Sequence, residues 1–214
     1  SHEAKIFGTS LLYLNKYLNS DFKNPFQNFD ITSKSNLKYN IHPLPFGRQL
    51  AVHILMEKVV NHKMILEYIV KSSKTKDRIT GFPAGCHFHV MEAYFLKGLY
   101  LNISSIYAHA VSEIKNLSDF SNTWFFQMIK VYHCVALHSE KKNKTAQILF
   151  RAIEFDTMFV NAPWYKNYFR VQYLLAEWII FCQRKSEKRG KLVKSEILSL
   201  SEKLGFDFYP KMLN

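Results

Sequence analysis

Apolar residues recur every three or four positions along most of this chain, and that spacing predicts α-helices. From residue 86 to residue 205 the pattern forms three pairs of amphipathic segments, each pair joined by a short turn. The predicted helices of this region span residues 86–100, 103–117, 121–138, 144–157, 163–184 and 191–204. Alternating patterns typical of strands are nearly absent, so the sequence predicts an all-α fold.

Two further helices are predicted before this region, over residues 4–19 and 47–71. The second has a possible weak point at Asn61-His62-Lys63, and its buried stripe is predicted to be Val52, Leu55, Val59, Leu66 and Val70. A stretch rich in Pro, Asn, Ser and Phe, residues 20–46, separates the two helices as a long loop. We therefore expect an N-terminal helical portion over residues 1–80 and the array of three helix pairs over 81–214, together forming one compact unit.

The helix pairs start near residues 86, 121 and 163, a spacing within the range of helix-turn-helix solenoids. This predicts a right-handed array of antiparallel helix pairs that is TPR-like, or α-solenoid-like, in architecture. Ala146 and Phe150 fit the small and aromatic positions of the tetratricopeptide pattern, whereas Ile153 stands where that pattern has alanine. The likeness is therefore one of architecture and not of family.

Details of packing can also be predicted within the array. In the segment 144–157 the predicted buried stripe is Leu149, Ala152, Ile153 and Phe155. Trp124 and Trp178 lie on the predicted buried stripes of successive first helices. Gly205 stands where a left-handed residue commonly ends a helix.

Composition adds a strong positive charge and an aromatic core to this picture. The chain of 214 residues has a net charge of +12 and contains 18 Phe, 12 Tyr and 3 Trp. Such a charge favours acidic partners, such as a nucleic acid, an anionic membrane or an acidic protein segment. Three sparse cysteines (Cys86, Cys134 and Cys182) are typical of a reducing compartment, and no apolar run is long enough to span a bilayer. We therefore expect an intracellular protein of the cytoplasm or nucleus without a membrane span.

Lysine and arginine gather at two of the predicted turns. Because turns of the same kind fall on the same edge of a helix-pair stack, we expect these cations to lie side by side. We call them the basic edge: Lys141, Lys142, Lys144, Arg184, Lys185, Lys188, Arg189 and Lys191. The sequence thus favours a non-enzymatic interaction module that binds a peptide segment of a larger protein assembly, a nucleic acid, or both.

Signatures of catalysis or of cofactor binding are missing from the sequence. Carboxylates are few, and no glycine-rich phosphate loop is present. A zinc site would need converging ligands. The candidates are Cys86, His87 and His89 together with His133, Cys134 and His138, but His133 and His138 are five residues apart and a helical face prefers three or four. We therefore expect neither an enzyme, a cofactor nor a bound metal.

Two alternatives remain open. Arg48 and His53 form an Arg-x4-His pattern on a predicted helix, which resembles the motif of the helical HEPN ribonucleases. The resemblance covers these two residues and the helical class, and it implies metal-independent RNA cleavage at a 2′-hydroxyl and its phosphate by paired protomers. The other alternative is a regulatory domain that senses a small ligand or signal peptide, since an aromatic-lined helical array can enclose one.

Overall fold

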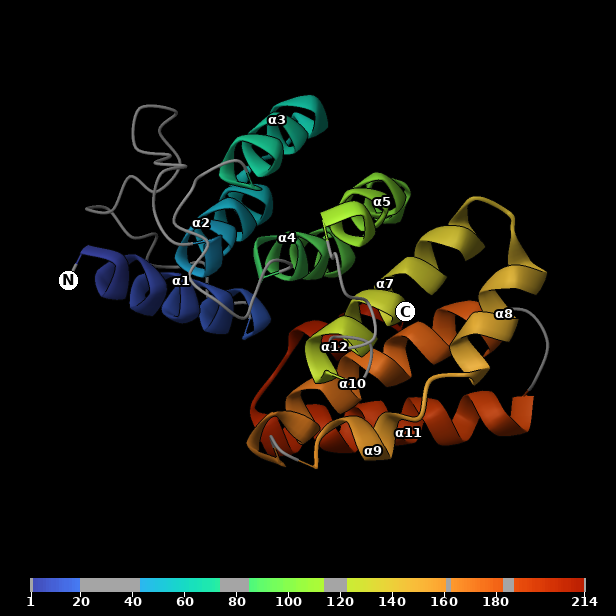
Figure 1. Ribbon diagram of the computed structural model, residues 1–214. Helices are drawn as coiled ribbons and strands as arrows, with labels where there is room; N and C mark the ends of the chain where they lie inside the picture. Colours follow the sequence, from blue (N-terminus) through green and yellow to red (C-terminus); the bar gives the residue numbers. More distant parts are fainter. Residues whose placement is uncertain are drawn as a thin grey trace. The chain divides into compact units, whose positions relative to one another are not determined.

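The computed structural model describes residues 2–19, 43–73, 85–113, 123–160, 163–182 and 187–213. Every element within these ranges is helical and none is a strand, which confirms the predicted all-α class. The chain divides into two compact units, one formed by Ser1–Tyr17 with Phe22–Leu117 and the other by Leu18–Asp21 with Ser118–Asn214 (Figure 1). The predicted loop over 20–46 lies outside the described residues up to residue 42. None of the described helices combines the length and apolarity needed to cross a membrane.

The first unit is built around one central helix, α4. The helical elements of this unit are α1 (His2–Leu18), α2 (Pro43–Met56), α3 (His62–Ser73), α4 (Gly85–Leu96), the 3-10 turn η1 (Tyr100–Asn102) and α5 (Ile103–Glu113). Every residue of α4 after its first is buried, and α4 packs against both α2 and α5. Three of these buried residues (His87, His89 and Glu92) are polar, so the helices packed around α4 place it in the core. The predicted boundary after residue 80 lies outside the described residues and stays a prediction.

The predicted helix over 47–71 is broken at residues 57–61. Lys97 satisfies carbonyl groups at the end of α2, because its ammonium donates to the backbone oxygens of Ile54, Leu55 and Glu57. Carbonyls of a last helical turn otherwise have no partner within the helix. Asn61 then caps α3, since its Oδ1 accepts the Met64 N–H at 3.1 Å.

The break changes which side chains of the second segment are buried. Val59, predicted for the buried stripe, lies in the connection and is 85 % exposed. Ile65 and Ile69 are buried in place of Leu66 and Val70. A single helical period drawn through both segments therefore assigned the wrong face to α3, because the connection resets the phase of the helix.

Gly47 allows the backbones of α2 and α4 to approach closely. A Cβ at this position would lie 2.6 Å from the Cα of Cys86, and backbone atoms cannot give way easily. We expect Gly47→Ala to lower the free energy of unfolding by about 1–3 kcal/mol through overpacking. Gly8→Ala is the matched control: a Cβ there meets nothing within 4 Å. That change should stabilise α1 by roughly 0.5–1 kcal/mol. Urea denaturation of both variants checks this, and equal midpoints would contradict the close approach.

The second unit contains two helix hairpins. Its elements are α7 (Trp124–Ser139), α8 (Asn143–Arg151), α9 (Phe155–Met158), the 3-10 turn η2 (Pro163–Tyr165), α10 (Lys166–Glu177), the π-helical η3 (Trp178–Cys182), α11 (Glu187–Leu204) and α12 (Phe208–Met212). α7 packs against α8, and α10 with η3 packs against α11. The predicted TPR-like arrangement of the whole array stays a prediction.

Contacts between the first helices of the hairpins show that α7 and α10 run in the same direction. The rings of Trp124 and Phe169, near the starts of the two helices, lie 5.1 Å apart. Further along, the hydroxyl of Tyr132 donates to Oε1 of Gln172 at 2.5 Å, and both residues are fully buried. Buried polar groups are normally paired in this way.

Two predictions about helix ends and faces have different outcomes in this unit. Gly205 ends α11 with φ +70°, and the N–H of Phe206 donates to the Ser201 carbonyl at 2.8 Å, which confirms the predicted left-handed end. The stripe predicted for residues 144–157 is wrong in part. α8 ends at Arg151 and is too short to carry it, and Leu149 is 44 % exposed. The buried residues of α8 are Ala146 and Phe150.

Candidate functional site

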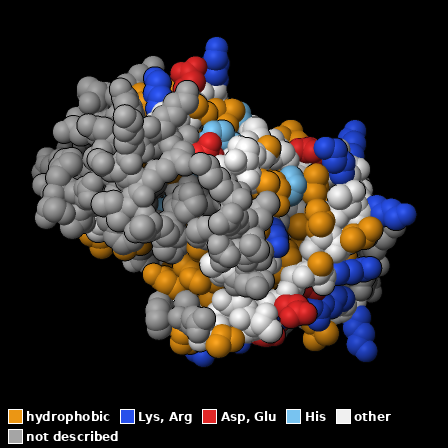
Figure 2. Space-filling view, in the orientation of Figure 1, with side chains coloured by type: hydrophobic (Ala, Val, Ile, Leu, Met, Phe, Trp, Pro, Cys, Tyr) orange, Lys and Arg blue, Asp and Glu red, His pale blue; other side chains and the backbone are white. Residues whose placement is uncertain are grey.

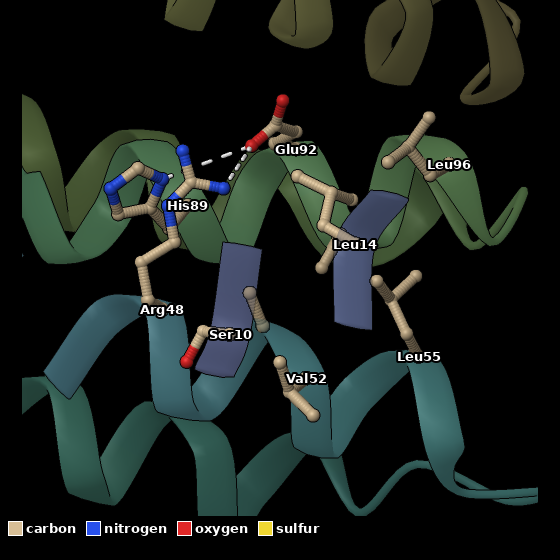
Figure 3. Close-up of a pocket in the computed structure, with 10 residues that line it drawn as sticks. Ser10, Leu14, Arg48, Val52, Leu55, His89, Glu92 and Leu96 are labelled. Atoms are coloured by element: carbon tan, nitrogen blue, oxygen red, sulfur yellow. Dashed lines mark ion pairs between the residues drawn. The ribbon is translucent and has the colours of Figure 1, made fainter. Parts of the chain in front are cut away.

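Arg48, the first residue of the predicted ribonuclease pair, belongs to a buried polar cluster between α2 and α4 (Figure 3). Its Nη1 lies 3.5 Å from Oε2 of Glu92, and the two side chains are only 12 % and 2 % exposed. Nδ1 of His89 lies 3.8 Å from the same carboxylate oxygen. Ser10 of α1 lines the cavity beside these groups. A charge pair this deeply buried is held in place by its surroundings and is costly to break.

His89 is the neutral member of the cluster. Burial, reinforced by the positive charge of Arg48, lowers the pKa of His89 to about 4, although the Glu92 carboxylate acts in the opposite direction. The cavity that the cluster lines has a volume of about 10 Å³. That is room for roughly one water molecule and not for a nucleotide.

Stability should therefore depend on pH through His89. Its pKa is lowered from 6.5 to about 4 in the folded state, so the unfolded chain binds more protons between these values. The stability that comes from keeping His89 neutral is fully present above its ordinary pKa of 6.5 and is lost as the pH falls toward 4. We expect a loss of about 2 kcal/mol between pH 7 and pH 5. Urea denaturation across this range checks it. His89→Phe should flatten the pH dependence, and an unchanged slope in that variant would contradict the assignment.

His53, the second residue of the predicted pair, lies on a different face of α2 from Arg48. Five residues along an α-helix correspond to a rotation of roughly 140° between the two side chains. His53 is buried, and its Nδ1 lies 3.9 Å from Oε1 of Glu57. Arg48 and His53 thus approach different carboxylates, and the structure does not bring them together on one exposed surface.

The cysteines and histidines considered for zinc fall into separate units. Cys86, His87 and His89 lie on α4, whereas His133, Cys134 and His138 lie on α7. Within the described residues, no three His, Cys, Asp or Glu side chains are grouped so that they could hold a metal ion. The three cysteines are free thiols and all are buried. Burial raises the pKa of Cys86 and of Cys134 to about 12, so these thiols are poor nucleophiles at neutral pH.

The basic edge lies on the second unit. Lys141, Lys142 and Lys144 are exposed around the turn from α7 to α8, and Lys188, Arg189 and Lys191 are exposed at the start of α11. Figure 2 shows Lys and Arg side chains along the side of this unit formed by α8 and the start of α11. Both α8 and α11 contact η3, so the helices that follow or carry the two groups of cations lie against one helical segment. Arg184 and Lys185 lie outside the described residues.

Carboxylates neutralise only part of this edge. Lys142 pairs with Glu140 at 2.7 Å, and Nη2 of Arg189 pairs with Glu177 at 2.6 Å. The four remaining lysines make no ion pair with any residue that the structure describes: Lys141, Lys144, Lys188 and Lys191. The edge therefore keeps a net positive potential that favours acidic ligands.

Lys141 has an unusual backbone conformation at the centre of the first turn. Its φ is +65°, in the left-handed region that favours glycine. The turn satisfies the end of α7, since the N–H of Lys142 donates to the Leu137 carbonyl at 2.9 Å and the N–H of Lys141 to the His138 carbonyl at 3.0 Å. The helix predicted over 121–138 ends within one residue of α7, although the glycine that usually marks such an end is absent.

Sequence reasoning identified the charges of the basic edge but missed the partner of Arg48. No function was predicted for Glu92, because it is the only carboxylate in the largely apolar segment 86–96. A lone acid in such a segment is itself a signal, since a buried carboxylate requires a cation nearby. Comparison with known proteins adds no assignment: no family model matches the chain, and no curated protein or solved structure matches it.

Proposed function

We propose that this protein is a non-enzymatic helical interaction module that binds an acidic partner through the basic edge. The observation that carries the proposal is a group of exposed lysines in the second unit, around the α7–α8 turn and at the start of α11, that make no ion pair with any described residue. The partner would be a segment of a larger protein assembly or a nucleic acid. In the finer form of the proposal, the hairpins α7–α8 and α10–α11 are consecutive members of a TPR-like array whose turns share this edge.

Two further features support binding over catalysis. The titratable cluster of the first unit surrounds a cavity of about 10 Å³, which leaves no room for a substrate beside Arg48 and His89. The cations of the edge, in contrast, lie on an open surface where a ligand can approach. Exposed charges of this kind contribute little to folding, so they are available to a ligand without loss of the fold.

The proposal is tested by reversing only those lysines of the edge that make no ion pair with a residue in the described ranges. The edge variant replaces Lys141, Lys144, Lys188 and Lys191 with Glu, which leaves the Lys142–Glu140 and Arg189–Glu177 pairs in place. The control variant replaces four other exposed lysines, Lys58, Lys63, Lys203 and Lys211, and so changes the net charge equally. Binding of a polyglutamate peptide and of a mixed-sequence RNA is measured over a series of salt concentrations.

We expect the edge variant to lose most of the affinity that the control variant retains. For RNA, the dependence of affinity on salt should become shallower by about three to four units in the logarithmic slope. Circular dichroism should show both variants folded, since exposed charges contribute little to stability. Equal binding by the two variants would show that the charge of the whole protein, and not this edge, attracts polyanions. Cleavage of the RNA by the parent protein would favour the ribonuclease alternative.

A further inference from the structure

One side of α8, beside the basic edge, exposes apolar side chains that the core does not use. The exposed residues on this side are spaced three and four apart, like the stripe of an amphipathic helix. We call this side the α8 face: Thr145, Ile148, Leu149 and Ala152. Ile148 is 58 % exposed and Leu149 is 44 % exposed. The opposite side of the helix packs into the core. The centre of the Phe150 ring lies 4.7 Å from that of Tyr173 and 5.8 Å from that of Phe181.

Cationic side chains lie at both ends of this face. Three lysines of the basic edge stand at the start of α8: Lys141, Lys142 and Lys144. At its other end the exposed Arg151 lies over the ring of Phe181 at 5.4 Å. An apolar strip between cations is complementary to a ligand that has apolar side chains along its centre and carboxylates at its margins.

A hollow continues the face beyond the end of α8. Its volume is about 330 Å³, and it is lined by Ala152 of the α8 face together with Gln127, Glu154, Thr157 and Met158. A side chain that projects from a ligand lying along α8 can enter this hollow. Glu154 makes the hollow itself unfavourable for a carboxylate, so the inserted side chain should be neutral.

The chemistry of the face distinguishes between the two classes of acidic partner. Proteins that bind single-stranded nucleic acid stack its bases on aromatic side chains. The large apolar residues exposed on α8 are aliphatic, and among the described residues the most exposed large aromatic, Tyr165, belongs to η2. Aliphatic side chains spaced three and four apart are instead typical of surfaces that bind an amphipathic helix.

We propose that the α8 face binds an acidic amphipathic helical segment of a partner protein, with its apolar side chains on Ile148 and Leu149 and its carboxylates on the neighbouring cations. This rests on the proposed function and narrows it from acidic partners in general to one class.

The experiment selects ligands without assuming a partner. A display library of fully randomised peptides, each about five helical turns long, is selected against the parent protein. The enriched peptides should carry apolar residues at positions i, i+3, i+4 and i+7, with Asp and Glu beside them. Enrichment without this pattern, or no enrichment, overturns the inference.

The best enriched peptide is then measured against two variants. Ile148→Asn/Leu149→Asn removes the apolar face and keeps every cation, and the edge variant described above reverses the charges. We expect each variant to weaken peptide binding at least tenfold, as for loss of central anchors. Because both changes are exposed, circular dichroism should show unaltered helix content and confirm that the fold is retained.

The outcomes separate failure of the inference from failure of the proposed function. If the edge variant loses binding while Ile148→Asn/Leu149→Asn binds as the parent does, the proposed function stands and the α8 face is not the docking site. If both variants bind as the parent does, both proposals fail. Binding of RNA, of phosphatidylserine vesicles or of a second copy of the chain that is lost in Ile148→Asn/Leu149→Asn would assign the face to that ligand and overturn the inference.

Discussion

Glu92→Leu is expected to lower the free energy of unfolding by about 3–5 kcal/mol, because it leaves the buried guanidinium of Arg48 without its carboxylate. Nη1 of Arg48 lies 3.5 Å from Glu92, and little water can reach either group. The positive charge would remain in an environment that solvates it poorly. Urea denaturation at pH 7 measures the change.

A double variant tests whether this cost comes from the orphaned charge. Arg48→Met removes the guanidinium while keeping an apolar side chain of similar length. Well-packed apolar residues can replace a buried ion pair with little loss of stability. The free energy of unfolding of Arg48→Met/Glu92→Leu should therefore be within about 1–2 kcal/mol of that of the parent. If the double variant is as unstable as the sum of the two single variants, the residues are not coupled and the cluster does not act as a pair.

Phe169→Ala should destabilise the second unit by about 3–5 kcal/mol, the range for deleting a large aromatic side chain from a core. Phe169 is buried where α7, α9 and α10 meet. Its ring lies 5.1 Å from that of Trp124 and stacks on Phe159 at 5.8 Å. The alanine variant would leave a cavity among aromatic rings that are held by several helices and cannot easily collapse.

Trp178→Ala provides a comparison within the same unit. Trp178 is only partly buried and lies beside Gly190 of α11, where a Cβ would approach its ring to 3.2 Å. Trp178→Ala should therefore lower the free energy of unfolding by less than Phe169→Ala does, although tryptophan is the larger residue. Chemical denaturation of both variants checks the order, and a larger effect at Trp178 would show that the core of this unit is centred elsewhere.

Local features of the fold followed from the sequence because their causes are local. Period-3.6 apolar patterns predicted the helical class, and Gly205 predicted the end of α11. The break before α3 was visible only as a weak point at Asn61, since it also depends on Lys97, which lies far along the chain but donates to the end of α2.

Features that depend on tertiary packing were missed. The burial of α4 on all sides, with His87, His89 and Glu92 included, depends on the helices packed around it and not on its own pattern. The pairing of Arg48 with Glu92 joins residues from two different helices, and no spacing rule connects them. In α8 the buried face is formed by Ala146 and Phe150, so Leu149, which was predicted to be buried, lies on the surface. The lysines of the basic edge, in contrast, were identifiable because charged turns are exposed in almost any helical fold.

The left-handed backbone of Lys141 lowers stability at a position that carries one cation of the basic edge. Glycine adopts this conformation without the steric penalty of a Cβ, which is about 1–2 kcal/mol. A selection for heat resistance alone would therefore favour glycine here and remove a cation from the basic edge. Engineering for higher melting temperature should leave this turn untouched, and the helix interiors far from α8 are the safer places to search for stabilising changes.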